Sequence, residues 1–135
     1  MFAALLRKFL KPAGNKPDAK LGEKGENVAA KYLTTKGYKI LQRNFMTKVG
    51  EVDIVARNGK TLVFVEVKTR VEEIVRPEDQ VTVEKQHQIT KAADVFLSRF
   101  GFPQPPAQFD VIAILWPPGR EPIIRHHENA FDATF

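Results

Sequence analysis

The segment Gly50 to Arg70, GEVDIVARNGKTLVFVEVKTR, constrains the fold most strongly, because it has the pattern of a β-hairpin. Two stretches rich in Val, Ile, Leu and Phe, residues 51–56 and 61–69, flank the dipeptide Asn58-Gly59. Asn-Gly suits the positive φ angles of a type I′ turn, which joins two antiparallel strands tightly. The segment therefore predicts two neighbouring antiparallel strands.

A turn centred on this dipeptide determines which residues face each other across the hairpin. It pairs Asp53 with Phe64 and Glu51 with Glu66. Because side chains alternate along a strand, Asp53, Glu66 and Lys68 then share one face. Directly opposed carboxylates repel each other, so the arrangement favours a cation between them.

The apolar run at 62–65 is typical of a strand covered on both faces, where an isolated carboxylate would take up a proton. A site that keeps Asp53 and Glu66 ionised is therefore expected to bind a divalent metal ion and to remain open to water. Oxygen ligands in a chain without cysteine favour Mg²⁺ or Mn²⁺ over zinc. On spacing alone, a surface ion pair between Glu66 and Lys68 explains the pattern equally well.

The rest of the chain supplies the other elements of an α/β domain. We expect helices at 21–36 and 82–100, and strands at 38–45, 109–116 and 122–127. The order helix, three strands, helix, two strands predicts a mixed central β-sheet flanked by helices.

Three further charged residues are candidates for a role at the hairpin. Glu26 lies at the border of the apolar face of the first helix, and a solvated helix glutamate is the alternative. Lys85 follows the expected N-cap Thr82 and lies on the apolar stripe of the second helix, where the helix dipole disfavours a lysine. A surface lysine with a buried stem is the alternative. Arg43, near a strand end, is either solvated or a phosphate contact.

Other polar residues are given structural roles. Asp110, at the start of a strand, is expected to be a capping or structural carboxylate. His126 and His127 are adjacent on a strand, so they point to opposite faces and do not form a paired metal site.

Charge is concentrated at the N-terminus. The 135 residues carry a net charge of +5, of which residues 1–20 contribute +4, so the remainder carries only +1. We expect residues 1–20 to be a basic amphipathic tail and linker and 21–135 to be one domain. The tail could dock on the domain, on a partner or on a membrane surface, or it could be disordered. No apolar run approaches the roughly 20 residues of a transmembrane helix, and the absence of cysteine suits the cytoplasm.

Several motifs together resemble known families. Gly25-Glu26 on a helix, then Asp53, then Glu66-Val67-Lys68 resembles the active-site order of the PD-(D/E)XK nucleases, which have the restriction-endonuclease-like fold. A longer set resembles the YraN-like family of small uncharacterised bacterial proteins, similar in fold to archaeal Holliday junction resolvases. Its motifs are GxxGExxAxxYL at 22–33, GYxILxRN at 37–44, GEVD at 50–53, LVFVEVKxR at 62–70, FDVI at 109–112 and HENAF at 127–131. The chain departs from this family pattern at Arg76-Pro77, in place of Gly-x-Pro, and at Gln108, in place of Arg.

The resemblance implies a metal-dependent endonuclease acting on DNA, including branched, Holliday-junction-like or repair intermediates. In that assignment Asp53, Glu66 and the Val67 carbonyl hold Mg²⁺ or Mn²⁺. Lys68 orients a water molecule or stabilises charge on the phosphate, and Glu26 assists through water.

The resemblance also implies secondary roles for five residues. Glu51, Lys85 and Gln86 are candidate accessory residues, and Arg43 and Arg70 are candidate DNA contacts. Because related resolvases are dimers, it further implies a possible homodimer. The alternative function is a non-catalytic module that retains the nuclease fold to bind DNA or a repair protein. A third is a docking protein that uses its N-terminal segment.

Overall fold

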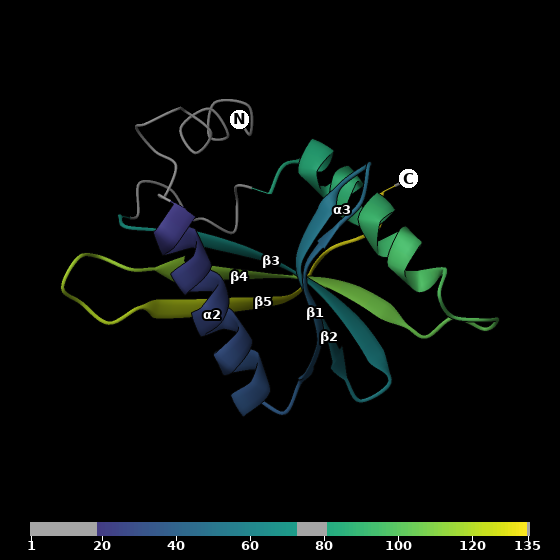
Figure 1. Cartoon of the computed structure of the whole chain (residues 1–135), viewed down its shortest axis with the longest axis horizontal. Coiled ribbons are helices and arrows are strands. Elements are labelled where there is room, and N and C mark those ends of the chain that lie inside the picture. The colour runs from purple at the N-terminus through teal and green to yellow at the C-terminus, as the bar shows by residue number, and fades with distance from the viewer. Residues whose placement is uncertain (1–18, 73–80, 135) are drawn as a thin grey trace.

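The computed structural model describes residues 19–72 and 81–134, which form a five-stranded sheet with a helix on each face (Figure 1). In chain order the elements are α2 (Ala19–Thr35), β1 (Lys39–Met46), β2 (Glu51–Asn58), β3 (Thr61–Arg70), α3 (Val83–Leu97), β4 (Ala107–Leu115) and β5 (Ile123–Phe131). Helix α2 begins inside the predicted linker, and the predicted tail at residues 1–18 lies outside the described part of the chain. Neither described helix is long and apolar enough to cross a membrane.

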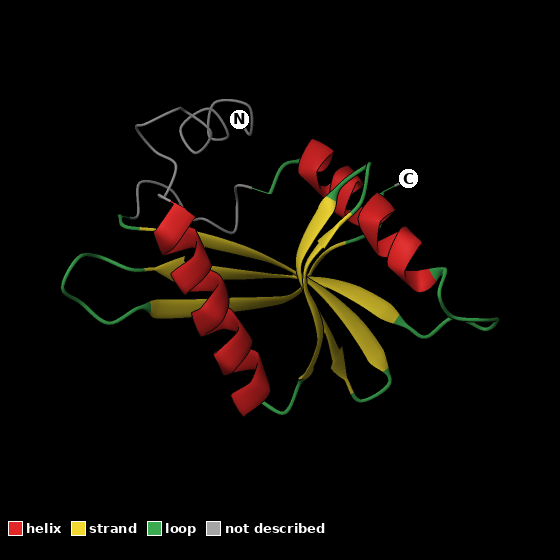
Figure 2. Cartoon of the chain, viewed as in Figure 1, coloured by secondary structure: helices red, strands yellow, loops and turns green. Residues whose placement is uncertain are grey.

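The sheet is mixed, as the sequence predicted. Its strand order is β1-β2-β3-β4-β5, with β3 and β4 parallel and every other neighbouring pair antiparallel. Two parallel strands need a long connection between them, and α3 lies within it. Figure 2 shows how the two helices lie on either side of the strongly twisted strands. The arrangement is an α/β fold compatible with the restriction-endonuclease-like architecture.

Two apolar layers lie on opposite faces of the sheet. Val55 and Phe64 pack with Phe96 of α3 in one layer, whereas Leu33 of α2 packs with Val65 in the other. Successive residues of a strand point to opposite faces, so Phe64 and Val65 need different partners. The continuous apolar run in β3 is therefore explained by a helix on each face, as the sequence indicated.

The turn between β2 and β3 is placed one residue later than predicted. Asn58 pairs with Thr61, so Gly59 and Lys60 are the two central residues. Gly59 has a φ of 62°, whereas Lys60 has no positive φ. Glycine at the first central position is the requirement of a type II′ turn, which also suits the twist of a hairpin.

The predicted hairpin pairing was consequently wrong by two residues. Val55 pairs with Phe64, and the described pairing continues to Ile54 and Val65. A shift of two leaves every side chain on its predicted face. It does change the partners, because Glu66 now lies next to Asp53 instead of opposite Glu51.

Helix α3 begins as predicted and ends earlier. The Thr82 hydroxyl accepts a hydrogen bond from the Lys85 amide at 3.1 Å, which confirms Thr82 as the N-cap. The helix ends at Leu97 instead of Phe100. The Phe100 amide bonds to the Leu97 carbonyl, three residues back, whereas an α-helix bonds to the carbonyl four residues back. Phe100 is therefore 41% exposed and outside the main core.

Strand β5 is longer than predicted and contains a bulge. Phe109 pairs with Phe131 and Val111 with His127, so residues 128–130 lie opposite Asp110 alone. Asn129, within this bulge, has a φ of 50°. Asparagine tolerates this left-handed conformation better than most residues. The strand thus continues through the bulge to Phe131, whereas the sequence pattern predicted its end at His127.

Candidate active site

The two predicted carboxylate ligands meet in the structure on the α3 side of the sheet. Asp53 comes from β2 and is partly exposed, whereas Glu66 comes from β3 and is only 4% exposed. The Val67 amide donates a hydrogen bond to Asp53 Oδ2 at 2.8 Å. Burial, and then the neighbouring charge of Glu66, raise the pKa of Asp53 well above its usual range. Of the two carboxyl groups, Asp53 is therefore the one that takes up a proton more readily.

Glu66 stays ionised despite its burial. Its Oε2 lies 3.6 Å from Lys68 Nζ and 3.6 Å from Lys85 Nζ. Burial raises the pKa of Glu66, but a hydrogen bond with Asp53 and the charges of the two lysines together outweigh burial and lower it. The pKa values of the two carboxyl groups are thus pushed apart, with that of Asp53 raised and that of Glu66 lowered.

The structure separates Lys85 from Gln86, the two candidate helix residues. The charge of Glu66 raises the pKa of Lys85 against the effect of burial, so this lysine is charged beside the acidic pair. The Gln86 side chain instead donates to the Val81 carbonyl at 2.9 Å. Only Lys85 faces the carboxylates, because Gln86 is held at the first turn of α3.

Glu26 reaches the sheet from α2. Its Oε1 lies 3.9 Å from an Arg43 terminal nitrogen, and its side chain also bonds Asn44. Burial raises the pKa of Glu26 although Arg43 acts in the opposite direction, and the charges of Glu51 and Glu66 raise it further. The helical GE motif and the strand RN motif of the sequence therefore form one contact.

A glycine explains how α2 comes so close to β3. A Cβ atom at Gly25 would overlap the Thr69 hydroxyl and leave less than 3.0 Å to the Thr69 Cβ. Glycine at this position permits the helix to lie directly on the strand. The next residue, Glu26, is thereby brought within electrostatic reach of Glu66.

The two candidate DNA-binding arginines lie at the border of this acidic group. Arg43 is the partner of Glu26, with its side chain 35% exposed. Arg70 is half-buried and donates to the Thr69 carbonyl at 2.7 Å. Burial lowers the pKa of Arg70 to about 10, although the charge of Glu66 opposes this, so its guanidinium remains charged at neutral pH.

Asp53 and Glu66 suit a hard divalent cation that takes only one or two of its ligands from protein carboxylates. No group of three or more His, Cys, Asp or Glu side chains that could hold a metal ion occurs within residues 19–72 and 81–134. Asp53 and Glu66 offer two neighbouring carboxyl groups, and a divalent cation between them would favour the ionised form of both. Mg²⁺ is commonly bound through one or two carboxylates, with water and phosphate as its other ligands. Lys68 and Lys85 would compete with the cation for Glu66.

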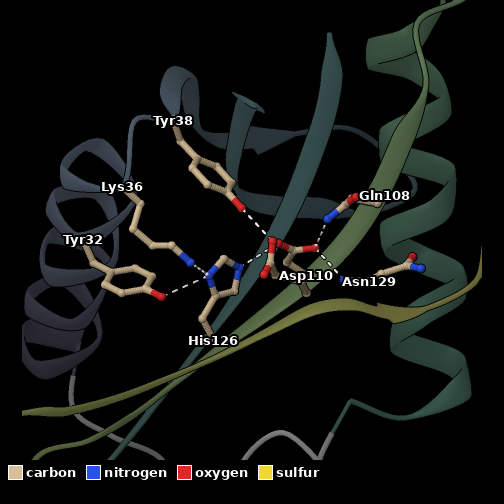
Figure 3. A network of polar contacts seen from close by, with 8 residues as sticks. Tyr32, Lys36, Tyr38, Gln108, Asp110, His126 and Asn129 are labelled. Atoms are coloured by element: carbon tan, nitrogen blue, oxygen red, sulfur yellow. Dashed lines mark hydrogen bonds and ion pairs between the residues drawn. The ribbon is translucent and has the colours of Figure 1, made fainter. Parts of the chain in front are cut away.

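A second buried polar network lies on the opposite, α2 side of the sheet (Figure 3). Asp110 is fully buried, and its Oδ2 lies 2.7 Å from His126 Nε2. Its Oδ1 accepts hydrogen bonds from the Gln108 side chain and from the Asn129 amide, both at 2.9 Å. Gln108 thus bonds the carboxylate at the position where the family resemblance has arginine.

The network connects β4 to α2 through His126. A carboxylate only accepts, so Nε2 of His126 carries a hydrogen, and in the neutral imidazole Nδ1 is then an acceptor. That Nδ1 lies 3.2 Å from the Tyr32 hydroxyl and 3.4 Å from Lys36 Nζ. Beside them, the Tyr38 hydroxyl donates to Glu128 at 3.0 Å (Figure 3). Burial raises the pKa of Tyr38 to about 12, and the bond to Glu128 contributes.

This network was not predicted, although its parts were noticed. Asp110 was expected to be structural, and its contacts agree with that interpretation. His126 was expected to be a structural or surface residue, and the structure gives it the structural role. The pairing of β4 with β5, which sets Ile112 opposite His126, brings Asp110 and His126 together.

The fold and this site define a small α/β protein with a mixed sheet and a paired-carboxylate centre, and comparison with known sequences identifies its relatives. Residues 25–114 match the uncharacterised protein family UPF0102, and the chain belongs to that family. The YraN-like resemblance is thereby confirmed.

The family extends over bacteria of several genera. The chain is 51% identical over 116 residues to a UPF0102 protein of Geobacter sulfurreducens, covering 85% of this chain and 91% of the relative. A UPF0102 protein of Geotalea uraniireducens is 49% identical over 116 residues, with the same coverage. A UPF0102 protein of Symbiobacterium thermophilum is 41% identical over 115 residues, covering 84% of this chain and 98% of the relative.

Proposed function

We propose that this protein is a metal-dependent endonuclease that acts on DNA, including branched or repair intermediates. The observation that carries the proposal is the meeting of Asp53 and Glu66 on adjacent strands with Lys68 beside them. Asp53 and Glu66, with the Val67 carbonyl, would hold Mg²⁺ or Mn²⁺. Glu26 would act through water at the border of the site.

The chemistry of phosphodiester hydrolysis matches what these groups offer. A divalent cation bound here would offset the negative charge of the scissile phosphate and lower the pKa of a water molecule. Lys68 would orient that water or place a positive charge beside the phosphate, where negative charge develops in the transition state. Lys85 would act as a positioning residue, because its charge helps to keep Glu66 ionised.

The surroundings of the site suit a nucleic-acid backbone. Arg43 and Arg70 are charged groups at the border of the carboxylates, and arginine binds phosphate oxygens well. The relatives are bacterial, so an enzyme acting on their DNA would work in the cytoplasm. A two-fold symmetric DNA junction would require two copies of the chain.

The test is a cleavage assay across DNA structures and metals. Labelled duplex, single-stranded, flapped and four-way-junction DNA would be incubated with the purified protein in Mg²⁺, Mn²⁺ or EDTA. We expect metal-dependent cleavage that falls by at least about 100-fold in Glu66→Gln and Lys68→Met. The matched control is Glu84→Gln, an exposed carboxylate beside Lys85 in the first turn of α3.

Folding must be checked for the same proteins, since Glu66 is buried between two lysines. Thermal unfolding followed by circular dichroism separates a folded inactive variant from an unfolded one. Equal cleavage by wild type and a folded Glu66→Gln protein would refute the assignment.

One observation favours the alternative, a DNA-binding module without catalysis. The candidate site has two carboxylates and a main-chain group, and Lys68 and Lys85 already neutralise Glu66. Such a module would bind DNA equally well in EDTA and would cut no substrate in any metal. The cleavage assay with a parallel binding measurement distinguishes the two functions.

A further inference from the structure

A groove lies beyond the carboxyl end of β3, at one end of the sheet. It has a volume of about 300 Å³ and is lined by the first two turns of α2, by the end of β3 and by the turn that follows β4. Figure 1 shows the N-terminal end of α2 beside the carboxyl end of β3. The lining includes Lys20 and Lys24 on one side, and Val71, Trp116 and Pro117 on the others.

The charge of this groove favours an anionic occupant. Lys20 and Lys24 are exposed and four residues apart, so they lie on the same face of the helix. Among the described residues, no acidic side chain lines the groove, and neither lysine forms an ion pair. The chain's own first 18 residues carry a net charge of +3, so charge disfavours them as the occupant.

The aromatic wall of the groove is held in place. The indole Nε1 of Trp116 donates to the Arg120 carbonyl at 3.0 Å, and its main-chain amide donates to the Arg70 carbonyl at 2.8 Å. A fixed indole that lines the same groove as two lysines is suited to stack on a nucleic-acid base while the ammonium groups contact phosphates. In a duplex the bases are paired and stacked, so only an unpaired base can present its face.

The distance to the carboxylates matches a short length of one DNA strand. Val71 is five residues beyond Glu66 along β3, which is about 17 Å at roughly 3.3 Å per residue. Successive phosphates in one strand of a stacked helix rise about 3.4 Å, so the distance corresponds to about five nucleotides. Arg70 lies along this path, immediately before Val71.

We propose that this groove binds an unpaired nucleotide of a single-stranded DNA arm that flanks the cleavage point. Lys20 and Lys24 contact its phosphates, and Trp116 stacks on its base. The inference rests on the proposed nuclease function and makes its substrate more specific: DNA in which a single-stranded arm leaves a duplex.

The binding test uses the natural fluorescence of the groove. Trp116 is the only tryptophan of the chain, so its emission reports on this place alone. The full-length protein would be titrated in EDTA with a short oligothymidylate and with a hairpin duplex of similar length. We expect quenching by the single strand and little or none by the duplex.

Variants show which groups contribute. Lys20→Gln/Lys24→Gln should reduce the slope of log affinity against log salt by about 1.4, because each phosphate contact in a single strand contributes about 0.7. Trp116→Leu, measured by anisotropy of a labelled oligothymidylate, should weaken binding roughly 5- to 150-fold. Lys39→Gln/Lys60→Gln removes the same charge outside the groove and should leave affinity near wild type.

A second control concerns the N-terminal segment, which is itself basic. Lys8→Gln/Lys11→Gln in the full chain should change affinity less than the substitutions at Lys20 and Lys24. Equal quenching by duplex, unchanged affinity in both groove variants, or a larger effect of the N-terminal substitutions would each overturn the proposal.

The outcomes also separate this proposal from the nuclease function. Metal-dependent cleavage of duplex DNA without quenching by the single strand would leave the nuclease and refute the groove. Single-strand quenching in EDTA, lost in the groove variants, together with no cleavage in any metal, would support the groove and refute the nuclease.

Discussion

Asp110→Asn is the substitution whose effect the structure determines most closely. The two carboxylate oxygens of Asp110 face three donors, namely His126 Nε2, the Gln108 side-chain amide and the Asn129 main-chain amide. An asparagine has the same shape, but one oxygen becomes an NH₂ group. With the NH₂ group in the place of Oδ1, it faces the two donors Gln108 and Asn129. With the NH₂ group in the place of Oδ2, His126 must change tautomer so that Nε2 accepts. We therefore expect the protein to be destabilised.

The magnitude follows from the number and type of bonds lost. A hydrogen bond to a charged group contributes about 1.5–3 kcal/mol, and leaving a buried donor or acceptor unsatisfied costs about 1–3 kcal/mol. Because asparagine keeps one acceptor oxygen, we expect a loss of about 2–4 kcal/mol in the free energy of unfolding. At about 2 kcal/mol per molar urea, in the middle of the usual range, the midpoint should fall by roughly 1–2 M.

The assay is urea unfolding followed by far-ultraviolet circular dichroism, with the slope of the transition compared between variants. Gln108→Ala is the matched control, because it removes one half-buried donor and leaves the other two bonds of Asp110; it should cost about 1 kcal/mol. An Asp110→Asn protein within about 0.5 kcal/mol of wild type, with an unchanged slope, would refute an ionised carboxylate accepting three bonds.

Three other substitutions test the site and its supports. Burial and the charge of Glu66 raise the pKa of Asp53, so the associated stability is fully present below the ordinary pKa of 3.8 and is lost as pH rises through the folded value. Asp53→Asn should thus be more stable than wild type at neutral pH but not in acid. The measurement is the urea midpoint of both proteins across pH. The reverse order would contradict a raised pKa of Asp53. Gly25→Ala should destabilise the protein by about 1–3 kcal/mol through overlap with Thr69, although alanine is the better helix former. A second substitution, Thr69→Ala, should recover part of the loss. An unchanged melting temperature of Gly25→Ala would exclude the close packing of α2 on β3. Asn129→Val should cost about 1–2 kcal/mol more than Asn129→Gly because of the left-handed backbone, and equal thermal stability of the two would argue against that conformation.

Most of the fold could be predicted because its signals are local. The apolar alternation of the hairpin, the glycine at its turn and the N-cap Thr82 all act over a few residues. The turn still admitted two placements around Gly59. In the folded sheet this glycine takes the first central position, and the pairing moves by two residues.

The candidate site shows where such local signals end. Alternation alone placed Asp53, Glu66 and Lys68 on one face of the hairpin. It could not show that Lys85, from the helix after β3, would lie as close to Glu66 as Lys68 does. The periodicity of the first helix likewise placed Glu26 near the sheet, but it did not reveal that Arg43 would be its partner.

The sequence by itself determined the order of the elements and the face on which each strand residue lies, since both depend on periodicity within single segments. Only the tertiary structure decided which polar groups meet. Asp110 and His126 are 16 residues apart, and Tyr32 is 94 residues from His126. Their contacts depend on strand register, on the bulge in β5 and on how α2 crosses the sheet. These are properties of the assembled layers, because a buried charge must find its donors wherever the folded chain brings them.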